Sequence, residues 1–78
     1  MKVKFETVNK IVNVCTACDK FVDNVYAVSG RYRVNAKSLM GLYSLDLSHE
    51  ISLIIDSENV DVINNFIKTI KGVLNSSD

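Results

Sequence analysis

The sequence contains no proline, no tryptophan and a single histidine, and it shows no internal repeat and no low-complexity stretch. It also lacks an N-terminal apolar run of about 7–15 residues, which would indicate a secretory signal. No segment approaches the length of a membrane span. Because there are two cysteines and no export signal, we expect a cytoplasmic protein whose thiols stay reduced.

Neither sign of charge is in excess, since nine lysines and arginines balance nine aspartates and glutamates. Proteins that bind nucleic acid or an anionic membrane usually carry a basic surface. The sequence therefore predicts neither a nucleic-acid partner nor a membrane partner. Its 78 residues, of which 47% are apolar and 23% charged, are typical of one small globular domain. We assign residues 1–75 to this domain and expect residues 76–78 to form a disordered tail.

The first part of the chain changes from one period of apolar residues to another. Residues 2–6 alternate, which predicts a half-buried strand. A helix follows, with Thr7 or Asn9 as its cap and with Lys10 and Ala17 on its polar side. The apolar stripe of this helix consists of Ile11, Val14, Cys15, Cys18, Phe21 and Val22.

A hairpin and a short helix are predicted next. Residues 25–29 and 31–35 are typical of strands, and the Ser-Gly pair between them is a turn signal. Ser38 is then placed to cap a helix of about two turns over residues 39–45.

A fourth strand and a final helix complete the chain. Residues 49–56 alternate except at Ile54, an apolar residue on the outward face. Asp56 or Ser57 is the expected cap of the last helix, with Glu58 in its first turn. The stripe of this helix consists of Val60, Ile63, Phe66, Ile67, Ile70, Val73 and Leu74. The order β-α-β-β-α-β-α, with one apolar side on each element, predicts an α+β sandwich with a single sheet covered on one face.

The stretch N-A-K-S-L-M-G-L-Y-S-L resembles the HPr family, the small phosphocarriers of the bacterial sugar phosphotransferase system. The family pattern is Lys/Arg-Ser-Ile/Leu-Met-Gly-Val/Leu-x-Ser-Leu. The matching residues are Lys37, Ser38, Leu39, Met40, Gly41, Leu42, Ser44 and Leu45. The resemblance implies an HPr-like open-faced sandwich, with a four-stranded antiparallel sheet in the order 1-4-2-3 and three helices on one face. We expect no cofactor and no metal.

The catalytic position of the family is where the sequence departs from it. In the family, a histidine that caps the first helix, usually in Gly-x-His-Ala-Arg-Pro, takes phosphate from Enzyme I and passes it to sugar-specific proteins. Counting back from Ser38, this position falls near Thr7, which is followed by Val8-Asn9-Lys10. A phosphate ester on a hydroxyl lacks the transfer potential of phosphohistidine. We therefore predict no catalytic residue here, and we do not expect an enzyme.

The regulatory position of the family is retained. The family's serine at Ser38 is phosphorylated by an ATP-dependent HPr kinase in some bacteria, and the phosphoprotein acts with a transcriptional regulator. Some family members lack the histidine and serve only this regulatory branch, and the sequence resembles that type. The resemblance implies that Ser38 accepts phosphate and that a surface around it binds HPr kinase, Enzyme I-like proteins or a regulator. That predicted surface comprises Lys37, Leu39, Met40, Leu42 and Tyr43. A short helix cannot bury all of its apolar residues, so burial in a homodimer competes with partner docking, and the protein is expected to be a monomer or a homodimer.

Two other features admit a chemical and a structural interpretation. Cys15 and Cys18 form C-x-x-C, but they lie inside the helical stripe, where cysteine packs as a small hydrophobe. A structural zinc site needs four ligands, and only His49 remains beside the two thiols. His49 is either a surface residue or an atypical phosphate acceptor. The remaining alternatives are thus a phosphocarrier with an atypical acceptor and an interaction module that uses the fold alone.

Overall fold

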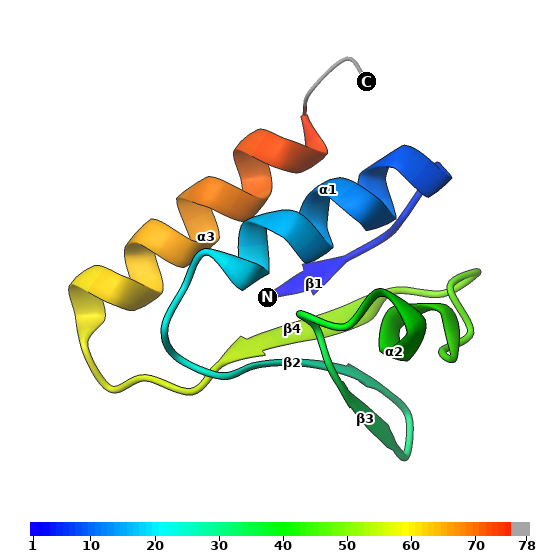
Figure 1. Ribbon diagram of the computed structural model, residues 1–78, viewed down its shortest axis with the longest axis horizontal. Coiled ribbons are helices and arrows are strands. Elements are labelled where there is room, and N and C mark those ends of the chain that lie inside the picture. Colours follow the sequence, from blue (N-terminus) through cyan, green and yellow to red (C-terminus); the bar gives the residue numbers. More distant parts are fainter. Residues whose placement is uncertain (76–78) are drawn as a thin grey trace.

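Seven elements make up residues 1–75, the part of the chain that the computed structural model describes (Figure 1). In chain order they are β1 (Lys2–Val3), α1 (Val8–Asp19), β2 (Val25–Ser29), β3 (Tyr32–Asn35), α2 (Leu39–Tyr43), β4 (Ile51–Ile55) and α3 (Val60–Leu74). This order confirms the predicted β-α-β-β-α-β-α arrangement. The tail predicted at residues 76–78 lies outside the described residues. Within residues 1–75, none of the helices is long and apolar enough to cross a membrane.

The four strands form one antiparallel sheet in the predicted order β1-β4-β2-β3. β4 is central, and its inward side chains, Ile51, Leu53 and Ile55, are all buried as their alternation predicts. The β2–β3 hairpin turns at Gly30, whose φ of 58° lies in the left-handed region that glycine adopts without steric cost.

β1 is shorter than the strand predicted at residues 2–6. Only Lys2 and Val3 pair with β4, and Met1 adds backbone hydrogen bonds of 2.7 and 2.9 Å with Leu53. Pairing ends there because the chain turns away towards α1. Phe5 nevertheless stays buried, so the alternation places its side chain correctly beyond the end of the strand.

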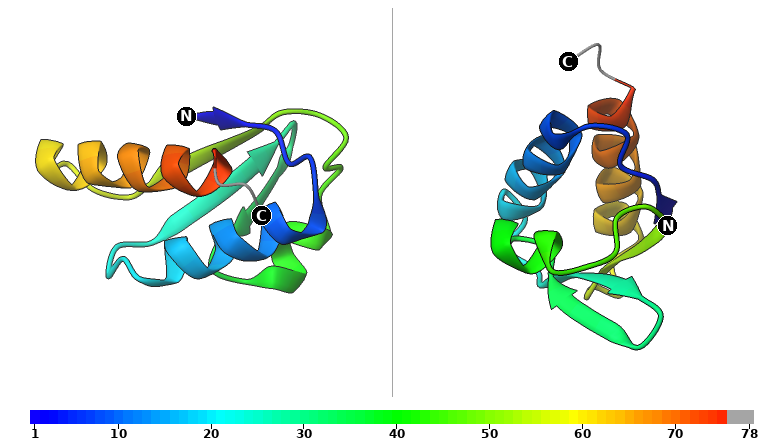
Figure 2. Two further views of the ribbon diagram at one scale, coloured as in Figure 1. Left: turned by 90° about the horizontal axis from the view of Figure 1, so that it is seen from above. Right: turned by 90° about the vertical axis from the view of Figure 1, so that its right-hand side faces the viewer.

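The helices cover one face of the sheet and leave the other face open (Figure 2). α1 and α3 lie side by side, and Phe21 and Phe66 meet edge to face between them with ring centroids 5.4 Å apart. α2 packs against α1 and β3. The most deeply buried large side chains are Phe66, Leu42, Ile51, Leu53, Ile70, Val14, Val25 and Cys18.

The buried side of α1 differs in part from the predicted stripe. Lys10 and Ala17 are buried rather than exposed, because α3 packs against that side of the helix. The Lys10 ammonium donates to the carbonyl of Val73 at 3.4 Å. Val22 was assigned to the stripe, but it is 96% exposed because α1 ends at Asp19.

The start of α3 also differs from the prediction. Asn59, rather than Asp56 or Ser57, caps the helix, and its side-chain oxygen accepts a hydrogen bond from the Asp61 amide at 2.9 Å. Asp61 is the acidic residue of the first turn, a position where the positive end of the helix dipole favours it. The predicted helix is therefore correct, but its cap lies two to three residues later than expected.

Candidate functional site

Ser38 caps α2, as predicted. Its backbone is extended, with φ −101° and ψ 116°, and its Oγ accepts a hydrogen bond from the Gly41 amide at 3.2 Å. The Ser38 carbonyl accepts from the Leu42 amide at 3.0 Å. The Ser38 side chain is half-buried, so it serves the helix while part of it remains at the surface.

Gly41 explains why this helix can start so close to the end of β3. A Cβ at this position would lie 3.2 Å from the carbonyl oxygen of Asn35 and 3.5 Å from the Ser38 Oγ. The Asn35 carbonyl is itself held, because it accepts from the Ser38 amide at 3.0 Å. The glycine therefore permits a close approach of two backbone segments.

Lys37 ties the start of α2 to α1. Its ammonium donates to the carbonyl of Phe21 at 2.5 Å, just beyond the end of α1, where the helix dipole favours a cation. Its own carbonyl accepts from the Cys15 thiol at 3.3 Å. Lys37 thus has a structural role, and its predicted part in partner binding stays a prediction.

The side chains of α2 divide between the core and the surface. Met40 is 84% exposed, Tyr43 is 46% exposed, and Leu39 is half-buried. Leu42, in contrast, is buried in the core, as is Leu45 just beyond the end of the helix. The assignment of Leu42 to the partner-binding surface is therefore wrong, because the single buried face of a five-residue helix is used to close the core.

Two valines of α1, the helix against which α2 packs, are also exposed. Val8 is 61% exposed and Val12, four residues later on the same ridge, is 38% exposed. Helical spacing places this ridge next to Cys15, which contacts the start of α2. We call Val8, Val12, Met40 and Tyr43 together the docking patch. The predicted apolar stripe of α1 did not include these two valines, although their i, i+4 spacing indicates that they share a helix face.

Thr7 occupies the N-cap of α1. It is exposed, and its hydroxyl oxygen accepts a hydrogen bond from the Lys10 amide at 3.2 Å. The Lys10 ammonium is directed to Val73 on α3 and is buried. The site that the resemblance assigns to a catalytic histidine thus holds a capping hydroxyl, and the nearest lysine of α1 contacts α3 instead.

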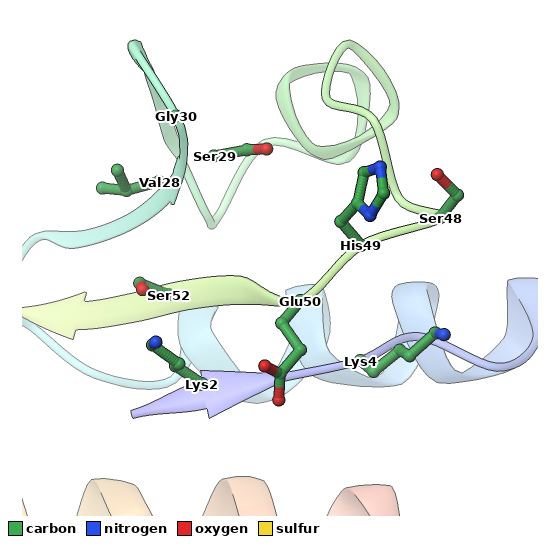
Figure 3. Close-up of a pocket in the computed structure, with 9 residues that line it drawn as sticks. All are labelled: Lys2, Lys4, Val28, Ser29, Gly30, Ser48, His49, Glu50 and Ser52. Atoms are coloured by element: carbon green, nitrogen blue, oxygen red, sulfur yellow. The ribbon is translucent and has the colours of Figure 1, made fainter.

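His49 lies in the loop before β4, in a shallow hollow of about 660 Å³ over the strands (Figure 3). Its Nε2 is 3.6 Å from the Asp46 carboxylate, and its side chain is 77% exposed. The Asp46 carboxylate accepts from the Ser48 hydroxyl at 2.6 Å and from the Ser48 amide at 3.1 Å, and these hydrogen bonds hold its pKa below the usual range. Neither Thr7 nor Ser38 lines this hollow.

The two cysteines are poor candidates for chemistry. Cys18 is fully buried, and desolvation, with a smaller contribution from Cys15, raises its pKa to about 12. Cys15 is half-buried, and desolvation and the nearby Asp19 carboxylate raise its pKa as well. Neither thiol is therefore activated as a thiolate near neutral pH. Among residues 1–75, no group of three or more His, Cys, Asp or Glu side chains is arranged to hold a metal ion.

Two solved structures share this arrangement of strands and helices. The histidine-containing phosphocarrier protein of a mycoplasma superposes with a TM-score of 0.70 at 18% identity, over 94% of this chain and 90% of that one. Crh, the catabolite repression protein of Bacillus subtilis, superposes with a TM-score of 0.66 at 24% identity, over 92% of this chain and 85% of that one. The Crh structure is an intertwined dimer with a swapped domain. Comparison of the sequence with family models and with curated proteins gives no match. The chain therefore has the fold of the HPr phosphocarriers, with the sheet order β1-β4-β2-β3 and three helices.

Proposed function

We propose that this chain is a regulatory, protein-binding member of the HPr-like proteins and does not carry phosphate on histidine. Its working surface is the docking patch together with the Ser38 hydroxyl at the start of α2. The observation that carries the proposal is the division of α2, in which Met40 and Tyr43 face solvent while Leu42 closes the core. We place its action in the cytoplasm, where ATP-dependent kinases work.

The composition of the docking patch favours a protein partner. Contiguous exposed apolar side chains usually mark interaction surfaces, and methionine adapts its shape to different partners. Met40 is the most exposed member of the patch. The patch is formed by two packed helices, which gives it a defined shape before a partner binds.

Ser38 is placed to regulate this surface. A phosphate there would add a charge of roughly −1.5 to −2 two residues before Met40. The Ser38 side chain is half-buried, so part of it remains at the surface where a kinase can reach it. The likeness to Crh, whose description refers to catabolite repression, supports a regulatory role of this kind.

The N-terminus of α1 argues against the carrier role. Thr7 uses its hydroxyl oxygen as a helix cap, and a phosphate ester at that oxygen would be too stable to pass on. The only histidine, His49, lies in a separate hollow beside the sheet. A carrier that used His49 would present its phosphate away from the docking patch.

Phosphorylation assays test the proposal. Incubation with HPr kinase and ATP is expected to label the protein, and Ser38→Ala is expected to abolish the label. Ser44→Ala is the matched control, because Ser44 is exposed at the other end of α2 and its hydroxyl donates to Gly41 at 2.6 Å. This control should retain full labelling.

A second assay addresses the carrier alternative. Incubation with Enzyme I and phosphoenolpyruvate is expected to leave no acid-labile phosphate on the protein. Acid-labile label that disappears in His49→Ala would overturn the proposal and favour an atypical carrier. No label in either assay would instead favour an interaction module that uses the fold alone.

A further inference from the structure

The open face of the sheet carries an apolar centre. Ile54 on β4 is 49% exposed, and Tyr26 and Val28 on β2 are half-buried. The register places Tyr26 directly opposite Ile54 and Val28 opposite Ser52, so these side chains share one face. Arg33 of β3 lies over the Tyr26 ring, with its guanidinium carbon 4.1 Å from the ring centroid.

This apolar centre is unexpected on the solvent side of an antiparallel sheet. The outward residues of such a strand are normally polar. Ser52 of β4 follows this pattern, whereas Ile54 does not. Ile54 does not contribute to the core, since the inward residues of β4 beside it are Leu53 and Ile55, which are buried. The open face is therefore a second apolar surface, separate from the docking patch.

Charges of opposite sign lie at the two ends of this face. Lys2 and Lys4 lie in the hollow at the start of β4, with Glu50 between them (Figure 3). Asp56 and Glu58 line a second hollow at the other end of β4, next to Ile54. Arg33 lines this second hollow beside Asp56 and Glu58, so that end carries a net charge of −1, and Lys2 and Lys4 less Glu50 give the other end a net charge of +1. The face is thus neutral as a whole, weakly basic at one end and weakly acidic at the other.

We propose that the open face binds the open face of a second copy of this chain. A two-fold axis that lies in the plane between the two faces, perpendicular to the strands, would bring the apolar centres together. The same axis would place the Lys2 and Lys4 end of each copy over the Asp56 and Glu58 end of the other. A face with this pattern is complementary to itself, and an isologous dimer uses one patch twice. Two sheets pack face to face about 10 Å apart, a distance that lysine side chains span.

The area of the face limits the affinity of this dimer. β2 and β4 have five residues each, β3 has four and β1 has two. At about 3.3 Å per residue and about 4.8 Å between strands, the face measures at most roughly 16 by 19 Å. This is smaller than the roughly 800 Å² per partner of a standard stable interface. We therefore expect a dissociation constant between roughly 10 µM and 1 mM, which rises with salt because the end charges are screened.

Sedimentation equilibrium from about 10 µM to 1 mM protein measures this association. Ile54→Thr keeps a β-branched residue and is expected to weaken the dimer about tenfold, because each dimer loses the apolar contact twice. Met40→Ala is the matched control on the docking patch and should leave the dimer unchanged. Circular dichroism verifies that both variants are folded.

A charge-exchange experiment fixes the orientation of the two copies. The double variant Lys2→Glu with Lys4→Glu, and the double variant Asp56→Lys with Glu58→Lys, should each be monomeric because like charges meet at both ends. An equimolar mixture of the two should form a heterodimer tighter than the unmodified dimer. In that heterodimer both pairs of ends are complementary. Net charges of −3 and +3 meet at one pair, because Glu50 and Arg33 now share the sign of their neighbours, and −1 and +1 meet at the other pair, as in the unmodified dimer.

A second mixture controls for overall charge. Lys20→Glu with Lys68→Glu, mixed with Glu6→Lys and Asp19→Lys, carries the same net charges on exposed residues away from the open face. This mixture should not form a tight heterodimer. A chain that stays monomeric at 1 mM overturns the proposal, and so does a dimer that survives both Ile54→Thr and the end-charge variants. That second outcome would point to exchange of β1 between copies or to pairing through the docking patch.

Discussion

Leu42 and Met40 lie two residues apart in α2, yet substitution of each should affect a different property of the protein. Leu42 is completely buried and contributes to the core beneath α2. Met40 is 84% exposed and contributes to the docking patch. We predict that Leu42→Ala lowers stability with little direct effect on binding, and that Met40→Ala does the reverse.

The structure sets the magnitude of each effect. Truncation of a fully buried leucine costs about 2–5 kcal/mol, because the side chain leaves a cavity that closes only in part. A domain of this length has a free energy of unfolding of roughly 4–12 kcal/mol. At about 4–8 °C per kcal/mol, a loss of about 3 kcal/mol lowers the Tm of Leu42→Ala by roughly 12–24 °C. Met40→Ala should change the free energy of unfolding by less than about 0.5 kcal/mol, since its side chain is at the surface.

Thermal unfolding followed by circular dichroism measures the first effect, and kinetics with HPr kinase measure the second. At a temperature where both variants are folded, Met40→Ala is expected to lower kcat/KM for phosphorylation about tenfold, the loss of a central interface contact. Leu42→Ala should retain kcat/KM within about threefold. Equal Tm values for the two variants would refute the assignment of Leu42 to the core. Equal kinetics for Met40→Ala and the unmodified protein would refute the docking patch as the kinase-binding surface.

Two further predictions concern the caps and the thiols. Thr7→Ala and Ser38→Ala each remove a side-chain helix cap, so each should lower the free energy of unfolding by about 1 kcal/mol, measured by urea denaturation; no loss in either variant would contradict the capping geometry. Cys18 should react with a thiol reagent at pH 8 only on unfolding, while Cys15 reacts slowly in the folded state. Because folding raises the pKa of Cys18 from 9.0 to about 12, the neutral thiol contributes stability below pH 9 that is lost as the pH rises towards 12. Cys18→Ala should show a smaller loss of stability over that range, and an equal loss would contradict the burial of the thiol.

Local pattern was sufficient to predict the order of the elements. The alternation in β4 and the 3.6-residue period of α3 are long enough to be distinguished from each other, and both have the predicted faces. The sheet order came from the resemblance, because no local pattern states which strands pair. The end of α1 and the packing of α3 over Lys10 depend on contacts between distant segments. The local pattern therefore predicted the wrong exposure for Lys10 and Val22.

The candidate site was predicted less completely than the fold. Ser38 was recognised as a cap because serine before an apolar run has a specific hydrogen-bonding role. The sequence pattern could not predict that Leu42 is buried and Met40 exposed, because nearly all residues of this five-residue helix are apolar. Val8 and Val12 became part of the surface only when the structure placed α2 beside α1.

The stretch that carries the resemblance is also explained, residue by residue, by the fold. Lys37 closes the end of α1, Ser38 caps α2, Gly41 allows the close approach to Asn35, and Leu42 fills the core. A chain that used this fold for any purpose would have reason to keep these residues, so their presence alone does not indicate phosphorylation. Met40 is different, because a side chain that is 84% exposed contributes little to folding. A methionine at that position is explained by an adaptable contact with another protein, which makes Met40→Ala the variant that separates the function of this helix from its role in the fold.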